Sequence, residues 1–253
     1  MLDLIEHENG IRELKLARPP VNALDASLIR VLRDAVESAP REGAQALVIS
    51  GAPGMFSAGL DVPSLLQLDR VGLESVWRDF FALFGALARS PIPCTAAITG
   101  HSPAGGAVIA LFCDYRVMAR GAYRIGLNEV QVGLTVPECI QAALRRLVGI
   151  YRAERMLVAG TMLDAEAAHA IGLVDEVVDV DFVTARAIAW TKELLALPRH
   201  AMLPTRELAR ADLAALFADP AKLPVQSFLD SWFAPATQAT LQALVARLKS
   251  KAG

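Results

Sequence analysis

The first residues of the chain alternate apolar and polar positions in two short β-like runs, at 2–7 and 11–17. The dipeptide Asn9-Gly10 separates them. Asn-Gly is typical of tight hairpin turns because both turn positions tolerate positive φ. The pattern therefore predicts an antiparallel hairpin at the N-terminus.

Farther along, short apolar runs alternate with segments of helical period. A helix is expected to begin near Asp25, a good N-cap residue, because the apolar positions after it recur at helical spacing. The later elements expected are a strand at 46–49, a helix at 73–87, a strand at 94–99, a helix at 105–112 and a strand at 115–119. Strands that alternate with helices indicate βαβ crossovers and a largely parallel sheet.

From about Pro137 the pattern becomes mostly helical. Gly172 is expected to end a helix over 164–170. A short apolar segment follows at 173–178, and amphipathic helices fill the rest from about Asp181. Since no repeat or long linker divides the chain, these last helices are expected to pack on the sheet domain or on a neighbouring subunit.

Composition narrows the class of protein. The 253 residues, of which 54% are hydrophobic and 21% charged, suit one large globular domain with or without a small appendage. No apolar run reaches the roughly 18 to 20 residues of a membrane helix, and the N-terminus lacks the features of a signal or transit peptide. The formal charge of −2 gives no general attraction to nucleic acid. Three widely spaced cysteines indicate free thiols in a reducing compartment.

Two glycine-containing turns are the best candidates for a site. GMFSAGLD (54–61) follows one expected strand, and PAGGAVIALFCD (103–114) opens a helix after another. One backbone N–H from each turn, aimed at the same oxygen, would make an oxyanion hole. Spacing alone leaves open that these glycines only allow close packing. His101, in GHSPAGG, is interpreted as a loop histidine rather than a catalytic one, and no metal-ligand spacing is present.

These turns belong to a wider resemblance. FSAGLD, PAGGAVIALFCDYR, IGLNEVQVGL and TMLDAEAAHAIGLVDEVV resemble, in order and spacing, the enoyl-CoA hydratase/isomerase (crotonase) superfamily. The pattern is most similar to its mitochondrial-type 3,2-trans-enoyl-CoA isomerases, with Ser102 where that subgroup has cysteine. The resemblance implies an α/β fold, with a crotonase-like spiral of ββα units over residues 1–195 and a C-terminal helical trimerisation region over 196–253.

The resemblance also implies a site. The backbone N–H groups of Leu60 and Gly105 would bind the thioester oxygen of an acyl-CoA, with no metal and no cofactor besides the coenzyme A of the substrate. The other residues implied in substrate binding are Val21, Ala23, Ser57, Ala58, Gly59, Asp61, Gly106 and Asn128. A homotrimer or a dimer of trimers is expected, in the cytoplasm of a bacterium or, in a mature form, in the mitochondrial matrix.

The choice of reaction depends on the number of acids. Hydratases of this superfamily carry one glutamate three residues beyond the first oxyanion-hole glycine, where this chain has Val108, and a second that matches Glu129. Water addition needs an acid and a base, whereas one base can move a proton from C2 to C4 of a 3-enoyl-CoA. The pattern therefore favours an isomerase of fatty-acid β-oxidation over a hydratase or another crotonase-type acyl-CoA enzyme.

Three alternatives remain open from the residues. Without the resemblance, Glu129 would be interpreted as a surface or salt-bridged glutamate, and Asn128 could simply pack. Glu138 could supply a second acid, although its place beside Pro137 favours a role at a helix start. A few crotonase-like proteins bind RNA or act as scaffolds, but this chain has no basic, aromatic-interleaved stripe.

Overall fold

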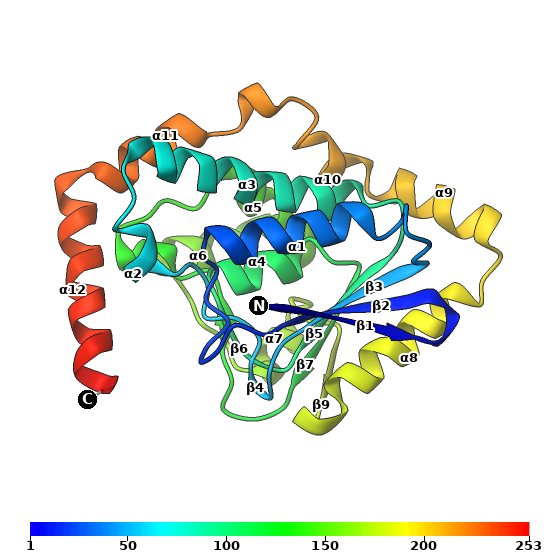
Figure 1. Ribbon diagram of the computed structural model, residues 1–253. Helices are drawn as coiled ribbons and strands as arrows, with labels where there is room; N and C mark the ends of the chain where they lie inside the picture. Colours follow the sequence, from blue (N-terminus) through cyan, green and yellow to red (C-terminus); the bar gives the residue numbers. More distant parts are fainter. Residues whose placement is uncertain (253) are drawn as a thin grey trace.

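The computed structural model describes residues 1–252 of the chain and is built around a six-stranded sheet (Figure 1). The strand order is β1-β2-β3-β5-β7-β9. The strands are β1 (Leu2–His7), β2 (Ile11–Leu16), β3 (Ala46–Ser50), β5 (Cys94–Ile98), β7 (Tyr115–Ala119) and β9 (Glu176–Val178). β1 and β2 pair antiparallel, and the other neighbours pair parallel. Asn9 and Gly10 both have positive φ in the turn η1 (Glu8–Gly10), so the predicted hairpin and parallel sheet are confirmed.

A second, smaller parallel sheet has the order β4-β6-β8. Its strands are β4 (Gly54–Met55), β6 (Gly100–Pro103) and β8 (Ile125–Gly126). Each one follows a strand of the large sheet along the chain, which generates the repeated ββα spiral that the resemblance implied. The sequence pattern did not predict these strands, because two to four residues are too few to display an alternating period.

Some of the helices begin at aspartate N-caps, whereas others have no side-chain cap among the described residues. Asp25 accepts a hydrogen bond from the Leu28 N–H at 2.8 Å, and Asp69 and Asp164 cap two further helices in the same way. The helices up to residue 195 are α1 (Ala26–Ser38), α2 (Val62–Leu65), α3 (Arg70–Arg89), α4 (Gly105–Leu111), α5 (Glu138–Val148), α6 (Ile150–Ala159), α7 (Ala165–Ala170) and α8 (Val183–Leu195). The 3-10 turns η2 (Glu129–Val132) and η3 (Val180–Phe182) lie between them.

Some predicted boundaries were wrong. The helix expected at 73–87 extends over 70–89, because Asp69 caps it one turn earlier. The short apolar segment at 173–178 forms a strand only over 176–178, because the N–H groups of Leu173 and Val174 bond to the Ala168 carbonyl near the end of α7. The strand expected at 94–99 ends at Ile98, and β6 begins two residues later.

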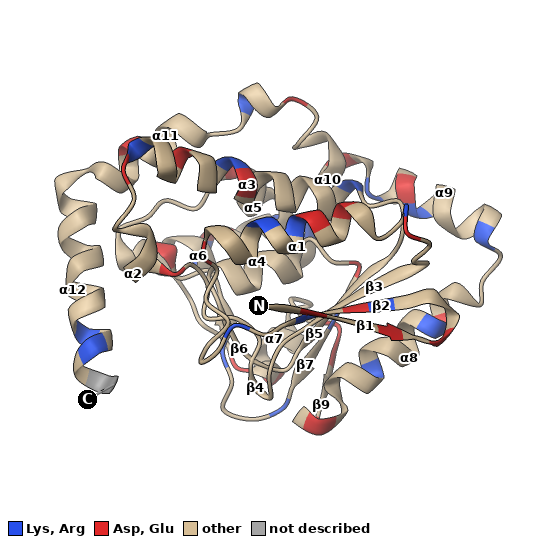
Figure 2. Cartoon of the chain, in the orientation of Figure 1, with Lys and Arg blue, Asp and Glu red and all other residues tan. Residues whose placement is uncertain are grey.

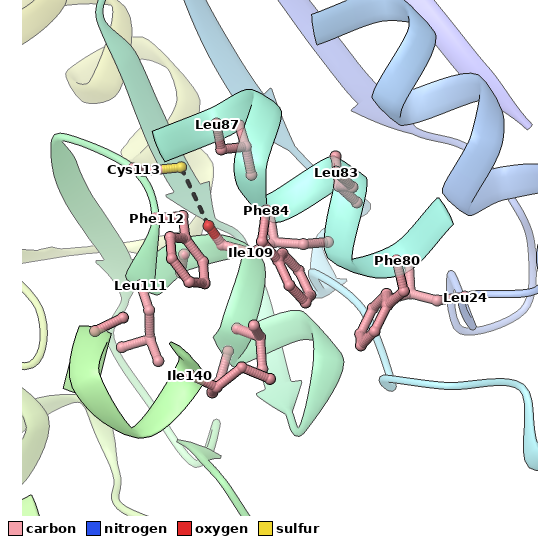
Figure 3. Close-up of a cluster of buried hydrophobic side chains, with 14 of the residues drawn as sticks. Leu24, Phe80, Leu83, Phe84, Leu87, Ile109, Leu111, Phe112, Cys113 and Ile140 are labelled. Carbon is pink, nitrogen blue, oxygen red and sulfur yellow. Dashed lines mark hydrogen bonds between the residues drawn. The ribbon is translucent and has the colours of Figure 1, made fainter. Parts of the chain in front are cut away.

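The large sheet is covered on both faces. Helix α8 packs on one face, where Val183 and Ala187 meet apolar side chains of β2, β3, β5 and β7. The larger core lies on the other face, beneath α1, α3 and α4 (Figure 1). There the rings of Phe80, Phe84 and Phe112 form a continuous series between α3 and α4, with centroids 4.4 and 5.2 Å apart (Figure 3). This core supports the start of α4, where one predicted oxyanion amide lies.

The remaining helices form a C-terminal arm, residues 199–252, that runs back along α3 to α2 (Figure 1). The arm consists of α9 (Arg199–Ala209), α10 (Ala211–Ala215), the 3-10 turn η4 (Pro220–Lys222), α11 (Val225–Phe233) and α12 (Pro235–Ala252). The arm packs on its own chain, which was one of the two arrangements expected. Gly253, the last residue of the predicted helical region 196–253, lies outside the described residues.

Charge and cysteines agree with the globular class. Acidic and basic positions are mixed along α1 and α3 (Figure 2). The three cysteines are buried and free. No helix within residues 1–252 combines the length and apolar character that a membrane crossing demands. The same described residues contain no cluster of three or more His, Cys, Asp or Glu side chains suited to a metal ion.

Candidate active site

Three segments of the candidate site leave the carboxyl ends of the three strands of the small sheet. β4 leads into the turn 56–61, β6 leads into α4, and β8 leads into η2, which begins at Glu129. Because β6 is the middle strand, the start of α4 lies between the other two segments. Ligands of parallel α/β sheets bind at such carboxyl ends. The small sheet, which the sequence pattern did not predict, is therefore what assembles the predicted residues.

The turn 56–61 and the start of α4 are in direct contact. A Cβ added to Gly59 would lie 3.1 Å from the Ala104 Cβ and 3.2 Å from the Gly105 backbone nitrogen. A Cβ added to Gly106 would lie 2.7 Å from the Ser57 carbonyl oxygen. Gly59 also has a φ of +80°, a conformation that favours glycine. These two predicted binding glycines therefore bring the two turns together.

Two backbone N–H groups at this contact have no acceptor. Among residues 1–252, neither the Leu60 N–H nor the Gly105 N–H donates a hydrogen bond. Gly105 is the first residue of α4, and the residue before it, Ala104, has a φ of +46° and a ψ of −120°. Such strain in a residue other than glycine is typical of functional sites. Two neighbouring free donors are the arrangement that an oxyanion hole requires.

The early loop, residues 18–24, runs beside the turn 56–61. The Ala58 N–H donates to the Val21 carbonyl at 2.9 Å, and the Leu24 N–H donates to the Gly59 carbonyl at 2.7 Å. The structure therefore brings together the predicted residues Val21, Ala23, Ser57, Ala58, Gly59, Leu60 and Asp61. Their role in binding coenzyme A remains a prediction.

The side chains of Ser57 and Asp61 serve the turn itself. The Ser57 hydroxyl is buried, donates to the Asn22 carbonyl at 2.7 Å and accepts the Gly59 N–H at 3.2 Å. Asp61 pairs with Arg18 at 2.6 Å and caps α2 by accepting the Ser64 N–H at 3.1 Å. Any coenzyme A contact of Ser57 would thus come from its backbone. Asn22 and Arg18 were not predicted from the sequence, although polar residues on either side of the Pro19-Pro20-Val21 segment were a signal.

Glu129 is the buried acid of the site. Only 8% of its surface is exposed, and one of its carboxylate oxygens, Oε2, is buried without a hydrogen-bond partner among the described residues. Burial raises the pKa of Glu129 from 4.5 to about 7, against a smaller lowering by its own backbone N–H. The surface or salt-bridged interpretation of this residue is wrong. A carboxyl group with a pKa near 7 can both accept and return a proton at neutral pH.

Val108 and Asn128, the two other residues considered with Glu129, differ in burial. Val108 lies in the second turn of α4, is 1% exposed and belongs to the apolar core. Asn128 precedes η2, and its half-buried side chain makes no hydrogen bond within residues 1–252. Near the free amide of Gly105, the closest side chains are apolar: a Cβ there would lie 2.9 Å from Leu24 Cδ1 and 3.4 Å from Phe80 Cζ. The side chains nearest to the Gly105 amide are thus apolar.

Glu138 and His101 lie outside this constellation. Glu138 is the first residue of α5, its side chain is 71% exposed, and it pairs with Arg145. This placement agrees with a role at the helix start. His101 is half-buried on β6, where its Nδ1 accepts the Arg124 N–H at 3.2 Å and its ring meets the edge of Tyr123. His101 therefore lies in a strand and not in the loop that was expected for it.

The fold and the site together define a crotonase-type protein, and the comparisons with known proteins agree. The enoyl-CoA hydratase/isomerase family profile matches residues 6–228, and the chain belongs to this family. Mitochondrial enoyl-CoA delta isomerase 1 of Homo sapiens is 32% identical over 247 residues, which cover 96% of this chain and 82% of the human protein. A probable enoyl-CoA hydratase of Mycobacterium avium is 35% identical over 212 residues, which cover 83% and 80% of the two chains.

A solved structure gives the same result. The crystal structure of human mitochondrial delta3-delta2-enoyl-CoA isomerase superposes with a TM-score of 0.94 at 30% identity, and the match covers 100% of this chain and 99% of that one. A probable enoyl-CoA hydratase from Mycobacterium tuberculosis superposes with a TM-score of 0.78 at 26% identity. The chain is therefore a member of an enzyme family that contains both isomerases and hydratases.

Proposed function

We propose that the protein isomerises 3-enoyl-CoA to 2-trans-enoyl-CoA, with Glu129 as its only catalytic acid–base group. The observation that carries the proposal is twofold: Glu129 is buried, with one carboxylate oxygen that has no hydrogen-bond partner within residues 1–252, and a buried valine, Val108, occupies the position where a hydratase would carry its other acid. The similarity to enoyl-CoA delta isomerases supports the same reaction. Fatty-acid β-oxidation, which needs this double-bond shift for some unsaturated chains, would be its setting.

In this mechanism the substrate thioester oxygen accepts hydrogen bonds from the Leu60 and Gly105 N–H groups. The Glu129 carboxylate removes a proton from C2, and the negative charge of the dienolate passes to the thioester oxygen between the two donors. The protonated Glu129 then gives the proton back at C4, and the double bond ends between C2 and C3. Atoms balance without a second acid, a metal or water. A pKa of about 7 leaves both protonation states of Glu129 accessible in turn.

The apolar surroundings would also protect the intermediate. Val108 offers no group to activate water, and Glu138 is exposed and paired with Arg145. A hydratase that used Glu129 with Glu138 would need the second carboxyl inside the site. The exposed position of Glu138 therefore favours the isomerase over that alternative.

The same site suggests where coenzyme A would bind, and the exposed apolar side chains suggest where subunits would meet. Coenzyme A would lie along the early loop and the turn 56–61, held mainly by backbone groups because the Ser57 and Asp61 side chains are engaged. A trimer or a dimer of trimers would cover the large apolar side chains that α6 and its start expose, namely Ile150, Tyr151 and Val158. The mass of the protein in solution tests the assembly.

The test of function is an assay of the purified protein with a 3-enoyl-CoA and, separately, a 2-enoyl-CoA. We expect rapid isomerisation, slow hydration, and a 10²- to 10⁴-fold loss of kcat in Glu129→Gln, the range for a missing general base. Glu138→Gln is the matched control and should keep its isomerase activity. Full activity in Glu129→Gln would disprove the assignment of the base. Fast hydration that disappears in Glu138→Gln would support a hydratase instead.

A further inference from the structure

The turn 56–61 holds its backbone donors in an unusual way. Five of its six N–H groups donate hydrogen bonds, and within residues 1–252 only the Leu60 N–H does not. The N–H groups of Phe56 and Ser57 reach the His101 carbonyl, and those of Ala58 and Asp61 reach the early loop. Because the groups on both sides of it are fixed, the free Leu60 N–H has a defined direction.

Asn22 lies at the centre of the contact between the early loop and this turn. It is 3% exposed, and its φ of +50° lies in the left-handed region that asparagine tolerates better than most residues. Its Nδ2 donates to the Phe56 carbonyl at 3.1 Å, and its Oδ1 accepts the Arg18 N–H at 2.8 Å. The first bond joins the two segments, and the second fixes the side chain within the early loop.

A second connection leaves from the Asn22 backbone. The Asn22 carbonyl accepts the Ser57 hydroxyl at 2.7 Å, and the same hydroxyl oxygen accepts the Gly59 N–H at 3.2 Å. Gly59, with its φ of +80°, carries the peptide bond whose nitrogen is the Leu60 N–H. Asn22 thus holds the turn at its first residue, Phe56, and at the peptide just before the free donor.

We propose that Asn22 is a positioning residue for the oxyanion hole, which it serves by aiming the Leu60 N–H at the thioester oxygen. The proposal rests on the proposed function, since it assigns the thioester oxygen to Leu60 and Gly105. The Asn22 side chain acts through the Phe56 carbonyl, and the Asn22 backbone carbonyl acts through Ser57 and Gly59. Neither group touches the substrate, because Asn22 is buried and both groups are hydrogen-bonded within the protein. Loss of the asparagine side chain should therefore affect transition-state stabilisation more than substrate binding.

Asn22→Gly is the variant that isolates this role. Glycine keeps the freedom to adopt positive φ, so the substitution removes the two side-chain hydrogen bonds without adding backbone strain. Ser57→Ala breaks the second connection independently. Asn9→Gly is the matched control, because Asn9 also has a positive φ, +63°, but is exposed in the β1–β2 turn with no side-chain hydrogen bond among the described residues.

The readout is twofold: kcat and KM with a 3-enoyl-CoA, and the ultraviolet absorption of bound 3-oxobutanoyl-CoA. This small ligand forms an enolate whose absorption reports how well a site stabilises charge on the thioester oxygen. We expect Asn22→Gly and Ser57→Ala to lower kcat about 10- to 100-fold, less than the 10²- to 10³-fold of a deleted oxyanion donor. KM should change less than threefold, and the enolate absorption should fall. Asn9→Gly should match the wild type in all three.

The results distinguish failure of the positioning role of Asn22 from failure of the proposed isomerase function. If the wild type binds 3-oxobutanoyl-CoA and both variants keep its enolate absorption and the full kcat, Asn22 has no positioning role, whatever happens to their thermal stability. If the wild type turns over no 3-enoyl-CoA and shows no enolate absorption, the proposed function fails and the role of Asn22 fails with it. A variant that does not fold leaves the decision to the other, since they break different bonds of the same network.

Discussion

Burial of Glu129 lowers the free energy of unfolding at neutral pH and gives this residue the pKa that a general base needs. Burial raises its pKa from 4.5 to about 7, so the folded protein binds this proton more tightly than the unfolded chain does. As pH rises through this interval the unfolded chain loses the proton first, and the free energy of unfolding falls. With about 1.4 kcal/mol per pKa unit, the loss at pH 8 is roughly 3 kcal/mol relative to a residue that does not ionise.

This gives a paired expectation for pH. Between pH 5 and 8, kcat/KM of the wild type should rise as Glu129 becomes ionised, with a midpoint near 7, while its free energy of unfolding falls relative to that of Glu129→Gln. Glu129→Gln should be more stable than the wild type by up to roughly 3 kcal/mol at pH 8 and by little at pH 4.5. Denaturant titrations at several pH values, with exposed Glu138→Gln as the control, measure the difference. Parallel stability curves for wild type and Glu129→Gln would contradict the buried, raised-pKa carboxyl.

At the scale of elements, the periodic segments were predictable and the short ones were not. Apolar spacing after Asp25 was sufficient to locate α1, because a long amphipathic pattern with a cap has few alternatives. β4 has two residues, and its pairing with β6 depends on a tertiary contact: a Cβ on Gly100 would lie 1.9 Å from the Gly54 carbonyl carbon. The local sequence around Gly54 does not indicate that this residue packs against Gly100.

The residues of the candidate site were also predictable only in part from the sequence. Motif resemblance supplied Glu129, Leu60 and Gly105 because it encodes a whole fold. It did not supply Asn22, whose importance lies in hydrogen bonds to Phe56 and Ser57 more than thirty residues away. Nor could it decide whether Glu138 faces the site, since a helix start beside Pro137 fits both an exposed and an inward carboxylate. Three-dimensional placement was needed for each.

The packing of α11 on α3 gives a prediction at this scale. The Phe228 ring meets Trp77 edge-on with centroids 4.5 Å apart and is nearly buried. Phe228→Ala should destabilise the protein by about 3–5 kcal/mol if the arm unfolds together with the core, and by less if the arm releases alone. Phe182→Ala, at a position that is 62% exposed, should change stability little. Denaturant unfolding and amide hydrogen exchange of α11 distinguish these cases; unchanged exchange in α11 would mean that this contact does not hold the arm.

At the scale of the whole molecule, the C-terminal arm contacts the segment after α4 near its start and the candidate site near its end. Near its start, Arg206 and Arg210 hold Asp114, the residue that follows Cys113 after α4, at 2.8 and 3.2 Å. Near its end, α12 packs on α2 and η2. Because removal of one partner from a buried ion pair is costly, the Asp114 contacts fix where the arm begins. Its far end can then support the segment that carries Glu129.

One hydrogen bond between α12 and the residue after η2 can be removed by a single substitution. Thr237 donates from its hydroxyl to the Gly133 carbonyl at 3.1 Å, directly after η2, and Gly133 is a left-handed residue with a φ of +79°. Thr237→Val keeps the shape of the side chain and removes this bond, so η2 should lose part of its support. We expect kcat/KM to fall about two- to tenfold, as for a loss of roughly 0.5–1.5 kcal/mol. Thr205→Val on α9, where the threonine is exposed, is the control.

A larger perturbation tests the same link in the whole chain. Removal of residues 235–253 takes away α12, and with it the contacts that α12 makes with η2 and α2. Although Leu241 of α12 is a buried member of the main apolar core, most of that core comes from residues before 235, so the truncated protein should be less stable but keep most of its far-ultraviolet circular dichroism per residue. Its kcat/KM should fall further than that of Thr237→Val. If both proteins retain the kcat/KM of the wild type while α12 is absent or loosened, then η2 holds Glu129 without help, and the arm serves only the stability or assembly of the molecule.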